Sequence, residues 1–214
     1  STWGCFRILG PPSGEPIVSD VACMLAELAR EIANCQRCGL SQGRTNTVPG
    51  EGPATARVML IGEGPGEQED RSGRPFVGAA GQLLGRLLSL AGLERSEVFI
   101  ANLVKCRPPR NRDPLPEESA ACRPYLDAQI ALLNPRVICL LGRPATQALL
   151  TPGASITRLH GQAQERDGML YVPLYHPAAA LHRSDLLPVL EADMRRLGVL
   201  LADPAVLGDD RGAR

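Results

Sequence analysis

The chain has 214 residues and a mass of 22.8 kDa, which is enough for one α/β domain with a sizeable core. Its 44% hydrophobic and 21% charged residues are ordinary for a globular protein, and no apolar run is long enough to cross a membrane. With 23 basic and 23 acidic residues the formal net charge is zero, which excludes a general polycation that coats nucleic acid but allows a local basic patch.

Strand and helix patterns alternate along most of the chain. Short apolar runs predict buried strands at residues 57–62, 98–104, 136–141 and 169–175. Helical spacing or capping signals predict helices at 81–88, 116–133, 144–150 and 185–201, with a hairpin arm over 158–166. This alternation predicts a mainly parallel sheet covered on both faces, with ligands bound beyond the carboxyl ends of its strands. We expect a single domain over residues 20–202, between a flexible arm at 1–19 and a polar tail at 203–214.

The seven cysteines point to a metal centre rather than to disulfides. An odd number without a signal peptide argues against a disulfide-stapled secreted fold and favours a reducing cytoplasm. Cys139 lies in an apolar run and is expected to be a core residue. Cys35 and Cys38 form a Cys-x2-Cys pair, and 15 residues separate Cys106 from Cys122. Four such thiolates suit either tetrahedral zinc or an iron–sulfur cluster, and the spacing leaves both open.

A glycine-rich acidic segment follows the first predicted strand, with the sequence Gly62-Glu63-Gly64-Pro65-Gly66-Glu67-Gln68-Glu69-Asp70. Its glycines allow the backbone to approach a ligand, and its carboxylates are candidates for activating water. The alternative is a solvated acidic turn before a helix. A phosphate-binding loop is disfavoured, because the Gly-Lys-Ser/Thr signature is missing and the carboxylates would repel a phosphate. Phe76 follows in a glycine-flanked loop, where it could stack on a planar ligand.

Two further segments lie at predicted strand ends. Asn102 ends the second strand and is followed by four cations, Lys105, Arg107, Arg110 and Arg112. These cations form a local positive patch suited to phosphate contacts, although a solvated surface loop would have the same composition. His176 follows the fourth strand, where a histidine is either a catalytic group or a structural one.

Together these motifs resemble the family 4 uracil-DNA glycosylases, the iron–sulfur branch of their superfamily. The resemblance covers about residues 28–200 and rests on the segments 62–66, 73–78, 102–109 with 111–112, and 176–178. It implies a three-layer α/β/α sandwich around a central four-stranded parallel sheet. It also implies a structural [4Fe–4S] cluster bound by Cys35, Cys38, Cys106 and Cys122.

The resemblance further implies a monofunctional DNA repair glycosylase. Such an enzyme flips uracil out of DNA and hydrolyses its N-glycosidic bond, leaving an abasic site. Gly64, Phe76 and Asn102 would bind the uracil, with Phe76 stacking on the ring and Asn102 pairing with its O4 and N3–H. His176 would donate a hydrogen bond to uracil O2, where negative charge develops.

One departure from the superfamily pattern affects the water-activating residue. The best-known branch has an aspartate where this chain has Gly64. We therefore expect Glu63 to orient the attacking water, with Glu69 and Asp70 as the next candidates. Leu181 or Arg183 is expected to wedge into the gap left by the flipped base.

The expected partner is uracil-containing DNA, single- or double-stranded, bound by a cytoplasmic, nucleoid-associated monomer with no membrane contact. Two other functions remain open: a zinc-binding nucleic-acid module without catalysis, and an α/β hydrolase that processes a small nucleotide. A third alternative is a relative of these enzymes that traps uracil-DNA covalently instead of releasing the base. Such relatives carry a long basic insert after the second strand and a histidine in place of Cys106, so this chain favours hydrolysis over trapping.

Overall fold

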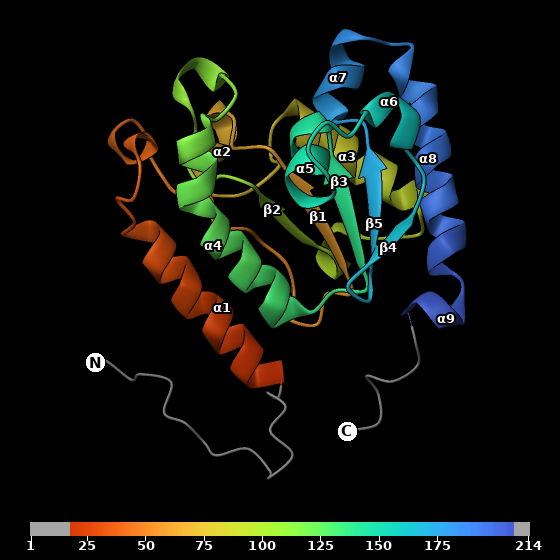
Figure 1. Cartoon of the computed structure of the whole chain (residues 1–214), viewed down its shortest axis with the longest axis horizontal. Helices are drawn as coiled ribbons and strands as arrows, with labels where there is room; N and C mark the ends of the chain where they lie inside the picture. Colours follow the sequence, from red (N-terminus) through yellow and green to blue (C-terminus); the bar gives the residue numbers. More distant parts are fainter. Residues whose placement is uncertain (1–17, 208–214) are drawn as a thin grey trace.

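The computed structural model describes residues 18–207 and shows one mostly parallel sheet between layers of helices (Figure 1). Strand order in the sheet is β2-β1-β3-β5-β4. The four parallel strands are β1 (Val58–Gly62), β2 (Phe99–Asn102), β3 (Val137–Leu141) and β5 (Met169–Leu174). The short strand β4 (Gln164–Arg166) pairs antiparallel with β5, so the sheet has one strand more than the four that were expected.

The central strands are apolar along their whole length because both of their faces are covered. All residues of β1 and β3 are buried, as is typical of parallel strands. One face packs against α3 (Ala79–Leu90), α7 (Pro177–His182) and α8 (Leu186–Leu201). The other packs against α4 (Pro116–Leu133) and α5 (Arg143–Leu149). The expected three-layer α/β/α architecture is therefore confirmed.

Helix α4 shows how local sequence sets an element's bounds. Pro116 occupies its first turn, where a missing N–H costs nothing, and Glu117 and Glu118 follow where the helix dipole favours negative charge. Asn134 ends the helix in the left-handed conformation, with a φ of 43°. The observed helix spans the same residues as the predicted one.

Several elements were not predicted. Helix α1 (Val18–Ala33) lies alongside α4, at the outer edge of the molecule (Figure 1). The short helices α2 (Glu67–Ser72), α6 (Ile156–Leu159) and α9 (Pro204–Leu207) were also missed, as was α7. The 3₁₀ turns η1 (Gly39–Gln42), η2 (Arg95–Glu97) and η3 (Pro109–Asn111) complete the list.

Both predicted chain ends need adjustment. Residues 18–19 already belong to α1, and residues 1–17 of the expected arm lie outside the described residues. The polar tail was predicted to begin too early, because Val206 and Leu207 in α9 pack against the core. Cys139 is fully buried in β3, as expected, whereas Cys23 in α1 is disulfide-bonded, which the sequence did not predict. Within residues 18–207 we find no helix of the length and apolar character needed to cross a membrane.

Candidate active site

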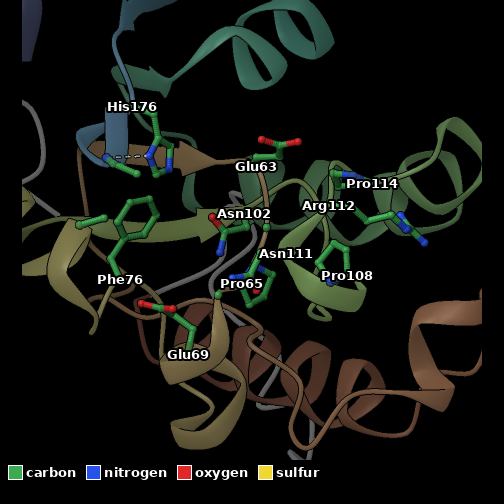
Figure 2. Close-up of a pocket in the computed structure, with 14 residues that line it drawn as sticks. Glu63, Pro65, Glu69, Phe76, Asn102, Pro108, Asn111, Arg112, Pro114 and His176 are labelled. Atoms are coloured by element: carbon green, nitrogen blue, oxygen red, sulfur yellow. Dashed lines mark hydrogen bonds between the residues drawn. The ribbon is translucent and has the colours of Figure 1, made fainter. Parts of the chain in front are cut away.

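The candidate site is a cavity of about 390 Å³ at the carboxyl ends of the parallel strands (Figure 2). Glu63 follows β1, Asn102 ends β2 beside Gly62, and His176 follows β5. All three line this cavity, as do Gly64, Glu69 and Phe76. The topology thus brings together residues that lie far apart in the sequence, such as Glu63 and His176. The expected location at the strand ends is confirmed for these residues.

Phe76 provides an apolar wall of the cavity. Its ring stacks on the imidazole of His176, with ring centroids 5.5 Å apart and planes inclined by 30° (Figure 2). Its backbone has a φ of 49°, a left-handed conformation that a residue with a bulky side chain adopts only when its surroundings impose it. The loop around Phe76 must therefore be held firmly.

Two charged side chains hold that loop. The Oε1 atom of Glu69 accepts hydrogen bonds from the backbone N–H groups of Val77 and Gly78, each at 2.9 Å. On the other side, the guanidinium of Arg95 donates to the carbonyl oxygens of Pro75 and Phe76, at 2.5 and 3.1 Å. Because its carboxylate already accepts two hydrogen bonds, Glu69 is suited to positioning Phe76 rather than to activating water.

Gly81 allows Phe76 to sit where it does. A Cβ atom on Gly81 would lie 1.8 Å from the carbonyl oxygen of Phe76, so Gly81→Ala must displace the Phe76 backbone. We expect this variant to fold but to lose most ligand binding in the cavity. Gly85→Ala in the same helix is the matched control, because its Cβ would meet nothing within 4 Å. Thermal unfolding and ligand affinity, measured on both, check the expectation; equal affinity in the two variants would contradict it.

Asn102 presents an unused hydrogen-bond acceptor to the cavity. The residue is only 2% exposed, and its Oδ1 atom has no hydrogen-bond partner. A buried acceptor without a partner costs about 1–3 kcal/mol, which a ligand's donor would recover. Its backbone carbonyl accepts a hydrogen bond of 2.9 Å from Nζ of Lys105, which fixes the end of β2.

Glu63 has the environment of a general base. It is half-buried, and its Oε1 atom is inaccessible to solvent and has no hydrogen-bond partner. Burial raises the pKa of this carboxyl, the charge of Asp113 raises it further, and the charge of Arg143 opposes the shift. A carboxylate with a raised pKa takes a proton more readily than an ordinary one, which suits it to polarising a water molecule.

His176 is arranged as a neutral donor. Its Nδ1 atom accepts a hydrogen bond of 3.1 Å from the backbone N–H of Ala178 (Figure 2), which places the ring proton on Nε2. Burial lowers the pKa of His176 to about 4, against an opposing effect of the Glu69 charge. At neutral pH the imidazole is therefore uncharged and offers one N–H to the cavity.

Comparison with known proteins identifies the family. Residues 49–195 match the model of the uracil DNA glycosylase superfamily. The chain belongs to this superfamily. The type-4 uracil-DNA glycosylase of Sulfurisphaera tokodaii is 45% identical over 190 residues, which cover 84% of this chain and 86% of that protein. The type-4 enzyme of Pyrobaculum aerophilum is 46% identical over 178 residues, covering 79% of this chain and 91% of that protein. A type-5 uracil-DNA glycosylase of Thermus thermophilus is 40% identical, over only 48% of this chain.

In this glycosylase-family chain, the four cysteines singled out in the sequence line a separate, smaller pocket between α1, η1 and α4, which we call the cysteine pocket. Cys35 and Cys38 follow α1, Cys106 lies in the β2–α4 loop, and Cys122 is in α4. Within the described residues, no three His, Cys, Asp or Glu side chains are placed to hold a single metal ion. All four cysteines line one pocket, and four thiolates are the ligand set of an iron–sulfur cluster.

Hydrogen bonds to the sulfur atoms also fit a set of thiolates. The backbone N–H of Arg37 donates to Sγ of Cys35 at 3.5 Å, and the backbone N–H of Lys105 donates to Sγ of Cys122 at 3.3 Å. The guanidinium of Arg44 donates to Sγ of Cys106 at 3.2 Å. Such donors stabilise negative charge on sulfur, so the residues present fit an iron–sulfur cluster.

Two sequence-based assignments are wrong. Lys105 does not contact DNA, because it is 1% exposed and its ammonium donates to the Asn102 carbonyl and to Oε1 of Gln129. Asp70 is not available to activate water. It is 3% exposed, and its Oδ1 atom accepts the backbone N–H of Thr45 at 2.9 Å, so it fixes the preceding loop instead.

The other predicted DNA-binding residues lie at the surface. Arg112 lines the cavity and forms a bidentate ion pair with Glu118, with distances of 2.7 and 2.8 Å. Arg107 donates to Oδ1 of Asn111 at 2.7 Å. Beyond them, the described surface has three further exposed candidates, Arg110, Leu181 and Arg183. None of these last three lines the cavity.

Proposed function

We propose that the chain removes uracil from DNA as a repair enzyme. It hydrolyses the bond between uracil N1 and the sugar C1′, releasing the free base and leaving an abasic site. The observation that carries the proposal is the buried, unpartnered amide oxygen of Asn102 beside the Phe76 ring in the cavity. The names of the relatives support the same activity.

Asn102 distinguishes uracil from cytosine. The enzyme must first extrude the nucleotide from the DNA, because a stacked base cannot enter the cavity. Oδ1 of Asn102 then accepts the N3–H of uracil, and Nδ2 donates to O4. Cytosine carries a donor at the position of O4 and an acceptor at N3, so both contacts fail. Leaving these groups unpaired costs about 1–3 kcal/mol each.

His176 and Glu63 act on opposite parts of the reaction. As the C1′–N1 bond breaks, its electron pair moves onto the uracil ring and charge collects on O2. The Nε2–H of His176 donates to that oxygen, which stabilises the leaving base. Glu63 orients a water molecule towards C1′ and accepts its proton as the new C1′–O bond forms.

Cys35, Cys38, Cys106 and Cys122 hold the proposed [4Fe–4S] cluster. When bound to these four thiolates, the cluster would cross-link the segment after α1 to the β2–α4 loop and α4. It takes no part in breaking the glycosidic bond. Arg107, Arg110 and Arg112 lie on the loop that the cluster would tie down, and they contact DNA phosphates.

We expect Cys122→Ala to lose the broad visible absorption of an iron–sulfur protein. The variant loses one of four ligands, so its melting temperature falls as well. Cys139→Ala is the matched control, because Cys139 is buried in β3 away from the pocket. Zinc found in place of iron and sulfide in the purified wild-type protein would contradict the cluster assignment.

The remaining proposals concern how DNA is bound. Leu181 or Arg183, at the end of α7, fills the gap left by the flipped nucleotide. The protein acts as a monomer in the cytoplasm, associated with the nucleoid. The protein prefers single-stranded DNA, because a base in a single strand can be extruded without the cost of breaking a base pair.

The function is tested with a labelled oligonucleotide that contains one uracil. Purified wild-type protein is incubated with it, and hot alkali then breaks the strand at any abasic site. We expect breakage at the uracil position only, and none in matched oligonucleotides with cytosine or thymine there. An intact strand, with the protein folded and bound to DNA, would instead support a non-catalytic binding protein.

A further inference from the structure

A second cavity, of about 350 Å³, shares Glu63 and Pro114 with the cavity of the proposed uracil site. Glu63 lines both cavities. The polar and charged residues that line the second are Glu63, Asp113, Ser119, Arg123, Arg143 and Gln147. Charged groups in this second cavity can therefore act on the Glu63 carboxylate without occupying the site of the base.

Two of these charged side chains have no partner of their own. Within residues 18–207, neither the guanidinium of Arg143 nor the carboxylate of Asp113 forms a hydrogen bond or an ion pair. Arg123 differs, because it pairs with Asp127 at 2.6 Å and donates to the carbonyl of Ala148 at 3.0 Å. Its charge is thus largely compensated, whereas those of Arg143 and Asp113 are not.

We propose that Arg143 and Asp113 are opposed positioning residues, whose charges act on Glu63 from the second cavity and together set how readily it exchanges a proton. This inference rests on the proposed role of Glu63 as the general base. Arg143 stabilises the carboxylate, and Asp113 stabilises the protonated form. Because Glu63 is half-buried, both charges are screened less than they would be at an open surface.

The directions of the pKa effects agree with this arrangement. After burial, Asp113 is the largest cause that raises the pKa of Glu63, and Arg143 lowers it. The other charged groups that line the first cavity are already engaged. In the first cavity Arg112 pairs with Glu118, and Glu69 accepts two backbone hydrogen bonds.

The neighbouring imidazole adds no charge at neutral pH. His176 lines the first cavity, and burial lowers its pKa to about 4, so it remains neutral where Glu63 acts as a base. Arg143 and Asp113 are therefore the two uncompensated charges, among the described residues lining these cavities, that can bias Glu63.

The two charges predict opposite shifts of the pH–rate profile. A general base works only when it is ionised, so the rate falls as the pH drops through the pKa of Glu63. Arg143→Gln removes the influence that lowers this pKa, and the acid limb moves to higher pH. Asp113→Asn removes an influence that raises it, and the acid limb moves to lower pH.

The test is the single-turnover rate of uracil release from a single-stranded oligonucleotide, measured across the acid limb. Relative to its own plateau, the rate on this limb is expected to fall by at least about twofold in Arg143→Gln and to rise by at least about twofold in Asp113→Asn. Arg143→Lys keeps the positive charge, so its acid limb is expected at the same pH as in the wild-type protein. Arg123→Gln, in the same cavity, leaves the limb where it is.

A second readout does not depend on turnover. The pKa of Glu63 is measured from the NMR signal of its carboxyl carbon, in the wild-type protein and in the same variants without DNA. We expect this pKa to rise in Arg143→Gln and to fall in Asp113→Asn. Unchanged limbs and titrations in an active enzyme would overturn this inference alone. A change in Arg143→Gln confined to KM and its salt dependence would assign Arg143 to phosphate binding and would also overturn it. An inactive wild-type protein would instead refute the proposed function.

Discussion

Replacement of Glu63 by glutamine is expected to slow uracil release by about 10²- to 10⁴-fold, the usual contribution of a positioned general base. The substitution keeps the size and polarity of the side chain but removes the group that accepts the proton of the attacking water. Substrate affinity should change little, because Asn102, Phe76 and His176 hold the base. Single-turnover kinetics with saturating enzyme measure the chemical step without interference from product release.

Glu67→Gln provides the matched control. Glu67 belongs to the same acidic segment, but its side chain is 48% exposed and pairs with Arg71 and Arg107 at the surface. We expect its rate to remain within about twofold of wild type. Full activity in Glu63→Gln would transfer water activation to another group, and Glu69 would be the remaining carboxylate in the cavity.

A second large loss is expected when His176 is replaced by phenylalanine. The aromatic ring preserves the contact with Phe76 but removes the N–H that stabilises the departing uracil. Loss of one such donor costs about 3–4 kcal/mol, or about 10²- to 10³-fold in the rate of the chemical step. His182→Phe, at the exposed end of α7, is the control and should retain its rate. Equal rates for the two variants would remove His176 from the mechanism.

The same substitution has a signature in the pH dependence of stability. Burial lowers the pKa of His176 from 6.5 to about 4 in the folded protein. Between these values the unfolded chain binds a proton that the folded chain does not, so the free energy of unfolding falls as the pH drops through this window. His176→Phe removes this contribution. Denaturant unfolding of both proteins between these pH values measures the difference in slope.

Local sequence signals were sufficient for the sheet and for bringing most residues of the proposed uracil site to one cavity. Each parallel strand is a short apolar run that ends beside a glycine or a polar residue, so its position could be predicted without knowledge of its neighbours. Glu63, Asn102 and His176 could be assigned to one site because parallel strands end at a common edge. The motifs of the glycosylase family then suggested a role for each.

What the sequence could not show depends on side-chain environment. Lys105 follows Asn102 among arginines and reads as part of a basic loop, yet its side chain folds inward to reach Gln129, 24 residues later in α4. Asp70 belongs to an acidic segment, but its carboxylate turns towards the backbone of Thr45. Neither partner is marked by periodicity or spacing. Helix α1 is a different case, because its sequence has a clear amphipathic helical pattern that was overlooked.

The strand order also bears on how the enzyme is made. Strand β1 is the first to be synthesised, and both of its neighbours, β2 and β3, come later in the chain. His176 follows β5, which is the last strand of the sheet in chain order. During translation, a ribosome-bound chain therefore carries Glu63 and Asn102 well before it can complete the reaction centre. Catalytic competence is gained only after β5 and His176 have been synthesised, so prematurely terminated chains that end before β5 would be inert on DNA.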